Sequence, residues 1–502
     1  MDRDRPLIRL LDYYLHTAMQ CDGKLARRAA VGSPPTVPIP RSTPMLCTRL
    51  DALAWMRREK ANLLAAFDLV HRQQRSRYVV ALSVALAGFL DLECLWAEAD
   101  LIHRAALAVA RSTGDQNNEA VALLNLARLC ESTGHRDETD DCCEKALAIY
   151  SDLGDQLGQA HVLRRQGSSW LAVGKPHEAV EALKQAQNLY HDLGDRRGEA
   201  SVLRDLGRVL HQLGDPIAWE LTSAALHLFR DMDDPTGEAD TLWDLGRYSE
   251  MTGDTHKALA LIEQARSIYV TLGNRIGEAN AQCELGWLRA ITGDANGAYA
   301  MIQTGLAIYR EVDSPHGQAL ANRLLGFARL EAGAHAEAAD ILEAALPEFR
   351  RLGLRHSEAE CLHDLARAKL PTGASDSAAQ LLRTALGIFE DLDNRRGRAD
   401  VLVTQARIAA ASKDPHHAHA LFLRAEELAR TAHVAGPRAA ALEGAGQVEL
   451  ALGDIAQAGF HFHEALEIYV RMGITAATRV AARLEQCRAL TPADSTTNTN
   501  HR

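Results

Sequence analysis

The chain has 502 residues, more than one compact hydrophobic core can organise, so several domains or one extended array are expected. Hydrophobic residues make up 47% of the chain but aromatic residues only 5%, a balance that favours closely packed helices over β-sandwiches. With 55 lysines and arginines against 66 aspartates and glutamates, the formal net charge is −11. This charge excludes nucleic-acid binding driven by bulk electrostatics, although a local basic surface remains possible.

Nine cysteines are scattered along the chain without metal-ligand spacing, and two of them, Cys142 and Cys143, are adjacent. This pattern predicts reduced thiols in helix interfaces and a cytoplasmic protein. The first residues contain no apolar core of the kind that signal peptides have. The longest apolar run, residues 78–90, ends at Asp91 and is too short to span a bilayer, so no membrane association is expected.

The N-terminal part of the chain, before Tyr78, is predicted to form three segments. Residues 1–21 place leucines and Tyr14 on one face and predict an N-terminal helix. Residues 22–47 contain five prolines, which block helix and favour an extended linker. Helical spacing resumes over residues 48–77, where Leu53, Met56, Leu63 and Phe67 form an apolar stripe, and this predicts a helical adaptor.

From residue 78 onward the sequence repeats. A glycine or alanine in the middle of a predicted helix returns with a period of about 40 residues, and a single step is one residue shorter than the others. This series is Ala127, Gly167, Gly207, Gly246, Gly286, Gly326, Ala366, Ala406 and Gly446. Alanines follow twelve residues later in most units, and again seven residues after that. Small residues at fixed places let two antiparallel helices approach closely and let successive pairs stack.

Glycines also separate the two predicted helices of most units, because glycine tolerates the left-handed conformation that ends a helix. They are Gly134, Gly174, Gly214, Gly253, Gly293, Gly333, Gly373 and Gly453. An aspartate often follows, as at Asp254 and Asp294, and can cap the next helix. The pattern predicts helix–turn–helix units with no strand between them.

The Leu-Gly of the first helix, as at Leu206–Gly207, and the two alanine series resemble the tetratricopeptide repeat. The resemblance covers residues 78–476, as a divergent first repeat at 78–117 and nine repeats at 118–476. These units are longer than the common tetratricopeptide unit, by about six residues each. The resemblance implies an all-α, right-handed superhelical solenoid of about ten antiparallel helix pairs, with a capping helix at 477–490. Residues 491–502 read as a disordered tail.

The N-terminal segment carries a second, shorter resemblance. Residues 9–18 (RLLDYYLHTA) and 52–66 (ALAWMRREKANLLAA) are similar to the segment that precedes the repeats in actinobacterial NB-ARC–tetratricopeptide transcriptional regulators. The chain contains no GxxxxGK[ST] motif, so no phosphate cradle can be proposed. The resemblance implies the C-terminal sensor half of such a regulator, either excised or encoded alone.

Motifs for chemistry are weak. His416, His417 and His419 cluster in one predicted turn, but no carboxylate or cysteine completes a ligand set, and a solvated turn is the simpler interpretation. The segment from His461 to Glu464 lacks HExxH spacing. No catalytic residues, metal site or cofactor are therefore predicted, and the chain is not expected to be an enzyme.

The tetratricopeptide resemblance places on the concave face the residues three before and one after each small residue. Arginines and aromatic residues dominate these positions. The candidate groove residues are Arg128, Arg164, Arg204, Arg208, Trp243, Arg247, Trp287, Arg323, Phe327, His363, Arg367 and Arg407. Because the guanidinium fork suits carboxylate and phosphate groups, these positions predict a basic groove with aromatic residues at its centre.

A second interpretation of the arginines is purely local. Arg208, Arg247 and Arg367 each follow an aspartate by three residues, a spacing that allows an ion pair along one helix. Arg128, Arg164, Arg204, Arg323 and Arg407 have no local acid at that spacing, and they favour a function in the groove.

The leading functional hypothesis is a scaffold that binds a protein or peptide of acidic character, or a peptide C-terminus. The arginines would hold carboxylates, and Trp243, Trp287 and Phe327 an apolar anchor, within a transcriptional regulatory system. The alternative is a sensor for an anionic, partly apolar metabolite bound at the same aromatic residues. Two further hypotheses are weaker. The net charge opposes direct DNA binding, and no residues can be named for an enzyme.

Overall fold

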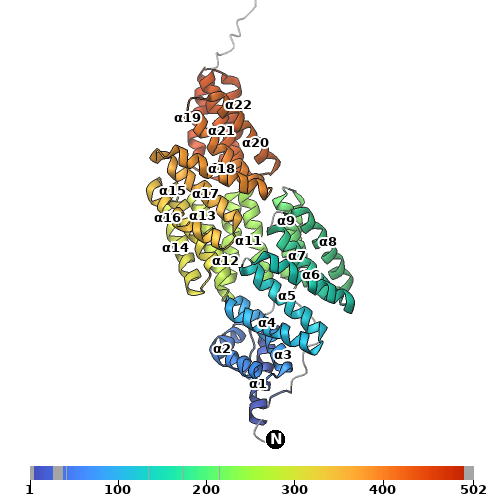
Figure 1. Cartoon of the computed structure of the whole chain (residues 1–502). Coiled ribbons are helices and arrows are strands. Elements are labelled where there is room, and N and C mark those ends of the chain that lie inside the picture. Colours follow the sequence, from blue (N-terminus) through green and yellow to red (C-terminus); the bar gives the residue numbers. More distant parts are fainter. Residues whose placement is uncertain are drawn as a thin grey trace, which may run out of the picture.

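The computed structural model describes residues 5–25, 38–40, 42–133, 135–172, 175–213 and 215–490. Within these ranges the chain forms α-helices and one short 3-10 helix, Leu370–Thr372, and no strand. Figure 1 shows the helices stacked along an elongated molecule, with the N-terminal helices at one end and α22 at the other. The all-α solenoid that the repeat predicts is confirmed.

Two helices precede the repeats. Helix α1 (Arg5–Leu25) packs against α2 (Arg49–Arg72) and α3, and Leu11, Leu15 and Met56 are buried among them. Thr48 begins α2 with a capping box, in which its hydroxyl accepts from the N–H of Asp51 and the Asp51 carboxylate accepts from the N–H of Thr48. Helix α1 extends into the stretch expected as a linker, and most of the remaining linker, residues 26–37, lies outside the described residues.

Ten antiparallel helix pairs follow, and α23 (Ala476–Leu490) covers the last pair. The first helices of the pairs are α3 (Ser76–Leu92), α5 (Gln116–Thr133), α7 (Gln156–Ala172), α9 (Arg196–Gln212), α11 (Pro235–Met251), α13 (Arg275–Thr292), α15 (Pro315–Glu331), α17 (Arg355–Lys369), α19 (Arg395–Ala411) and α21 (Ala435–Leu452). The second helices are α4 (Trp96–Thr113), α6 (Arg136–Leu153), α8 (Pro176–Leu193), α10 (Ile217–Asp231), α12 (Thr255–Thr271), α14 (Ala295–Glu311), α16 (His335–Arg351), α18 (Ser375–Asp391), α20 (Pro415–Thr431) and α22 (Ile455–Met472). The expected tail, residues 491–502, lies outside the described residues.

The small residues lie where the two helices of a pair come closest. A methyl group on Gly326 of α15 would lie 2.6 Å from Cγ of Leu342 on α16, which is closer than real Cβ contacts. A methyl group on Gly286 of α13 would lie equally close to Ile302 of α14. The repeated glycine therefore sets the distance between the helices, and any larger residue would force them apart.

A contact between an aromatic residue and a glycine, which the sequence analysis missed, joins each of several pairs to the next. The ring of Tyr190, near the end of α8, covers Gly198 in the first turn of α9, where a Cβ would lie 2.1 Å from the ring. Gly158, Gly237, Gly277, Gly317 and Gly397 lie under Tyr150, Phe229, Tyr269, Tyr309 and Phe389 in the same way. Tyr190 is fully buried, so this contact between successive helix pairs forms part of the hydrophobic core.

The turns follow the predicted chemistry where they are described. Gly253, Gly293 and Gly453 have φ between 90° and 102°, a left-handed conformation that glycine adopts without strain. Asp254 and Asp294 accept hydrogen bonds from the backbone N–H groups of Lys257 and Gly297 and cap α12 and α14. Gly134, Gly174 and Gly214 lie outside the described residues.

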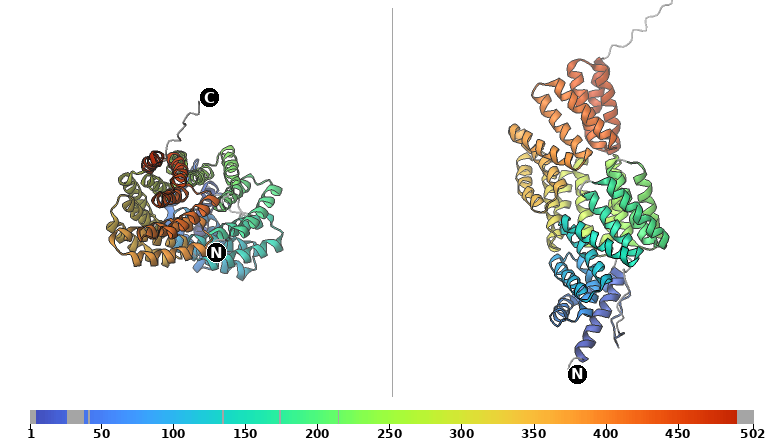
Figure 2. Two further views of the ribbon diagram at one scale, coloured as in Figure 1. Left: turned by 90° about the horizontal axis from the view of Figure 1, so that it is seen from above. Right: turned by 45° about the vertical axis from the view of Figure 1, so that its right-hand side comes forward.

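The first helices of the pairs line the inner side of the superhelix, where successive pairs approach most closely: α7 contacts α9, α13 contacts α15 and α19 contacts α21. Seen from above, the helices wind around a common axis (Figure 2). The superhelix also meets itself, because α12 contacts α22. A methyl group on Gly253 would lie 2.9 Å from Cβ of Ala435 and 3.2 Å from Cγ of Met472. Within the described ranges, no helix has the length and apolar character that crossing a bilayer requires.

Candidate binding groove

The inner arginines bond carboxylates of the neighbouring helix pair. Arg164 on α7 donates from Nη1 to Oδ2 of Asp205 on α9 at 2.8 Å. Arg323 on α15 donates in the same way to Asp364 on α17 at 2.9 Å. The partners are 41 residues apart in both cases, so each bond spans one repeat. These two arginines, which have no local acid in the sequence, therefore have one in the next unit.

Arg204 on α9 is the most heavily paired of the candidate residues. Its Nη1 lies 2.9 Å from Oδ2 of Asp240, and further contacts reach Asp205 at 3.5 Å and Asp244 at 3.6 Å. The side chain of Asp205 is 4% exposed. Burial raises the pKa of Asp205, but Arg164, Arg204 and Arg208 outweigh burial, and the pKa lies below its ordinary value. Arg204 is thus part of an ion network that ties α9 to α11.

Three other candidate residues are also engaged. Arg367 on α17 donates to Glu331 of the preceding repeat at 2.7 Å. Arg128 on α5 donates to the backbone carbonyl of Ala87 at 3.1 Å. The His363 ring lies 2.9 Å from Oγ1 of Thr404, and burial, with help from Arg367 and Arg407, lowers the pKa of His363 to about 3.

The three aromatic candidates differ in accessibility. Phe327 is 8% exposed and belongs to the core of α13–α16, with the Arg367 guanidinium 5.7 Å from its ring centre. Trp287 is half-buried beneath Arg396, also at 5.7 Å. Trp243 is half-buried beneath Arg247 at 5.0 Å, and its buried Nε1–H has no hydrogen-bond partner among the described residues. Phe327 therefore offers little surface to an apolar anchor, whereas Trp243 and Trp287 lie in the groove.

Three arginines keep exposed guanidinium groups. Arg208 on α9 is 42% exposed, and its nearest carboxylates, Asp205 and Asp244, lie at 3.8 Å. Arg247 on α11 is 52% exposed and lies 4.0 Å from Glu284. Arg407 on α19 is exposed, and no carboxylate of the described residues lies within ion-pair distance of it. Of the predicted arginines, these three present accessible charge to a ligand.

Carboxylates that the sequence prediction did not include lie beside the candidate arginines. Carboxylates stand two residues before the small residue in several units, at Asp205, Asp244, Glu284 and Asp364, and six before it at Asp240, Glu360 and Asp400. Their regular position was visible in the sequence, but the family pattern directed attention to the neighbouring positions. The candidate positions therefore lie among alternating charges, whereas the sequence predicts a basic groove.

The centre of the groove is crowded with carboxylates. Burial raises the pKa of Asp400 to about 6, although Arg396 and Arg367 act against it. Burial also raises the pKa of Glu284, against Arg247 and Arg396. Glu360 is different, because Arg323 at 3.2 Å and His356 at 3.6 Å overcome burial and hold its pKa well below the ordinary value.

A long-range ion pair, also missed, lies in this region. Arg396 on α19 donates from Nη1 to Oε2 of Glu250 at 3.2 Å and from Nη2 to Oε1 at 3.1 Å. Glu250 lies at the end of α11, 146 residues earlier, and is 8% exposed. No local pattern in the sequence could reveal this pair, because it depends on the pitch of the superhelix.

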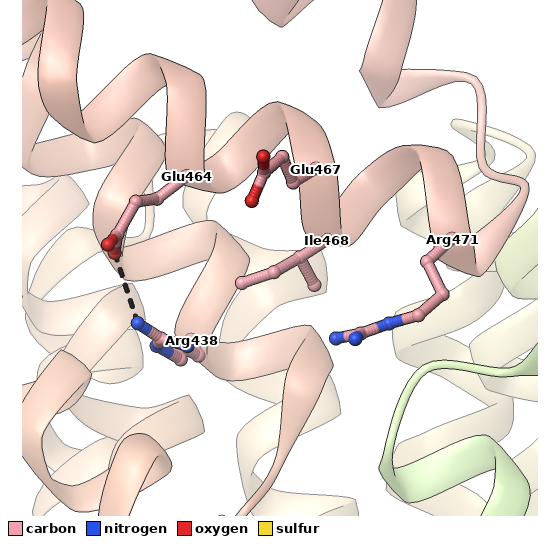
Figure 3. A pocket seen from close by; sticks show the side chains of 5 residues that line it. All are labelled: Arg438, Glu464, Glu467, Ile468 and Arg471. Atoms are coloured by element: carbon pink, nitrogen blue, oxygen red, sulfur yellow. Dashed lines mark hydrogen bonds and ion pairs between the residues drawn. The ribbon is translucent and has the colours of Figure 1, made fainter.

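Two cavities lie away from the central tryptophans. One, of about 150 Å³, is lined by Arg438, Glu464, Glu467, Ile468 and Arg471 at the C-terminal end (Figure 3). Another, of about 420 Å³, is lined by Leu163, Trp170, His177, Glu178, Glu181, Ala182 and Gln185 on α7 and α8.

The histidines predicted to lie in a turn, His416, His417 and His419, lie near the start of α20, and the half-buried His419 contacts a carboxylate. Nε2 of His419 lies 2.8 Å from Oε1 of Glu449, and Nδ1 of His461 lies 2.8 Å from Oε2 of the same carboxylate. These two contacts connect α20, α21 and α22. In the part of the chain that the structure describes, no three histidine, cysteine or acidic side chains are arranged to hold a metal ion.

Comparisons with known proteins reveal the fold. No protein-family model matches the chain, and no curated protein sequence matches it. A solved structure of a Rap protein complexed with competence and sporulation factor aligns with a TM-score of 0.55 and 13% identity, over 74% of this chain and 99% of that one. The Rap conjugation gene regulator of plasmid pLS20, in complex with the Phr* peptide, aligns with a TM-score of 0.51 and 14% identity, over 66% of this chain and 95% of that one. The chain is thus an α-solenoid of the tetratricopeptide type.

Proposed function

We propose that the chain binds a peptide, or an extended segment of a protein, along the inner face of the superhelix. The observation that carries the proposal is the pair Arg208 and Arg247, which occupy equivalent positions of adjacent repeats and keep exposed guanidinium groups. The Arg247 guanidinium also lies over the ring of Trp243. Exposed arginines can take up carboxylates of a ligand at little cost, because no strong bond must first be broken.

The ligand's charge pattern follows from the groove. Arg204 and Arg323 are already bonded to carboxylates, so they do not add free positive charge. A ligand with a carboxylate near Arg208 and Arg247, and without a long acidic run, fits this arrangement best. The sequence predicts a partner of acidic character. We propose, more specifically, that this partner is a segment with few carboxylates or a peptide C-terminus.

A further observation supports the proposal. The solved structures with the same fold include a Rap protein complexed with competence and sporulation factor and a Rap conjugation gene regulator in complex with the Phr* peptide. A regulatory role is the second part of the proposal, and it follows from the resemblance of residues 9–18 and 52–66 that the sequence suggests.

A small anionic metabolite is the second candidate, because Arg247 over Trp243 would also suit a compact ligand with a carboxylate and an apolar part. Affinity selection from a pool of synthetic peptides, run beside a thermal-shift screen of anionic metabolites, separates the two. Retained peptides support the proposal, and a rise in unfolding temperature with metabolites alone contradicts it.

A further inference from the structure

The ion pair between Arg396 and Glu250 differs from the other bonds of the groove in what it joins. Arg164, Arg204, Arg323 and Arg367 bond carboxylates 36 to 41 residues away, which belong to the adjacent repeat. Arg396 reaches over 146 residues to α11, four helix pairs earlier. It thus links parts of the superhelix that are not neighbours in the stack.

The contacts around this pair are thin. The helices that it links share no hydrophobic cluster, because the clusters that contain residues of α19 include no residue of α11 or α12 among the residues described. The two parts of the superhelix meet instead at turns, where Gly253 faces Ala435 and Gly473 faces His256. In Figure 3 a ribbon with the green of the α11–α12 region passes beside Arg471. The bidentate ion pair, whose carboxylate is buried, therefore adds to the contact of Gly253 with Ala435 and Met472 in joining these parts of the superhelix.

Arg396 is also placed to meet a ligand. Its side chain is 34% exposed and lies over Trp287 on the inner face, and it acts electrostatically on Glu284, Glu360 and Asp400. Burial raises the pKa values of Glu284 and Asp400, so a further carboxylate is unfavourable beside them. Glu250 is the carboxylate that accepts hydrogen bonds from Arg396. A ligand carboxylate can therefore bind Arg396 by replacing Glu250.

We propose that Glu250 occupies the place of a ligand carboxylate on Arg396, and that the bound peptide displaces Glu250 and opens the seam where α11 and α12 meet the repeats of α19 to α22. The inference rests on the proposed peptide-binding function and deepens it. It assigns Arg396 as a binding residue for a carboxylate of the peptide, and Glu250 as an intramolecular competitor that lowers the affinity until the ligand takes its place.

The test uses the full chain, a pool of random heptapeptides with free C-terminal carboxylates, and the variants E250Q, R396Q and E331Q. E331Q is the matched control, since it also removes a groove carboxylate bonded to an arginine, Arg367, but within adjacent repeats. For the peptide that wild type retains best, we expect E250Q to bind about tenfold more tightly, R396Q about tenfold more weakly and E331Q within about twofold of wild type.

Equal or weaker binding by E250Q, or equal tightening by E331Q, overturns the inference while leaving peptide binding intact. If wild type retains no peptide, the proposed function fails. The seam is then judged from small-angle X-ray scattering of the unliganded variants. A radius of gyration larger in E250Q and R396Q than in wild type and E331Q supports the inference that the Arg396–Glu250 pair holds the seam closed. An unchanged radius overturns that inference.

Discussion

Nη1 of Arg323 and Oδ2 of Asp364 lie 2.9 Å apart, although 41 residues separate the two in the chain. Both side chains are buried, with 11% and 6% of their surface exposed, and Glu360 adds a second carboxylate at 3.2 Å. Since this separation is close to one period of the repeat, the bond connects almost equivalent positions of successive units. Arginines of the inner face thus stabilise the contact between successive repeats, in addition to any role in ligand binding.

The first prediction concerns this bond. Arg323→Ala leaves Asp364 and Glu360 without their closest cation in a buried setting, and it should lower the free energy of unfolding by about 3–5 kcal/mol. Arg355→Ala is the control, because its 2.8 Å pair with Asp391 also spans a repeat but is 51% and 62% exposed. The control should cost about 1 kcal/mol or less. Urea unfolding followed by circular dichroism measures both, and equal losses would show that burial of the pair is unimportant.

The second prediction concerns the glycine beneath Tyr190. Gly198→Ala places a methyl group 2.1 Å from that ring and should destabilise the chain by about 1–3 kcal/mol, because a fully buried tyrosine must move. Gly387→Ala on α18 has no atom within 4 Å of the new methyl group and should stabilise by about 0.5–1 kcal/mol through helix propensity. Opposite signs in urea unfolding support the contact, and stabilisation by both variants would rule it out.

The sequence predicts the solenoid well because its signals are local and repeat. Leu206 and Gly207 recur in register, and nine appearances of one small residue leave little freedom in how the helices pack. The groove could be predicted only in part. The position of Arg204 follows from the family pattern, but its partners do not, because Asp240 lies in the next unit and not on the helix of Arg204.

The ion pairs that were not predicted are of two kinds, those that the sequence pattern can reveal and those that it cannot. Arg164 and Asp205 stand at fixed places relative to the small residues of their own units, so a comparison of acids and bases one period apart would have found them. Arg396 and Glu250 could not be found in this way, because the curvature of the whole superhelix brings α19 to α11. Curvature accumulates from small rotations between pairs, and no single residue encodes it.

The third prediction is a pH dependence at Asp400. Its pKa is raised from 3.8 to about 6 in the folded chain because the carboxyl is buried, so the folded state holds its proton more tightly than the unfolded state. Stability from this group is therefore lost as the pH rises from about 4 to about 6, and it stays lost above pH 6. Asp400→Asn should raise the free energy of unfolding at pH 7 by about 1–3 kcal/mol.

The gain from Asp400→Asn should shrink as the pH falls below about 6, and it should approach zero below about pH 4, where the carboxyl becomes protonated in the unfolded state as well. Asp340→Asn on α16 is the control, since Asp340 is exposed and makes no ion pair among the described residues. Thermal unfolding from pH 4 to pH 8 measures the difference. A gain that is independent of pH, or one that Asp340→Asn shares, would contradict the assignment.

The central claim is that a peptide binds at Arg208 and Arg247, and titration of the best-retained peptide tests it most directly. The double variant R208E/R247E reverses two exposed charges of the groove, and R310E/R424E reverses two exposed charges on α14 and α20. Isothermal titration calorimetry should show that R208E/R247E loses binding by about tenfold or more, with R310E/R424E within about twofold of wild type. Equal affinities for all three proteins would contradict the claim.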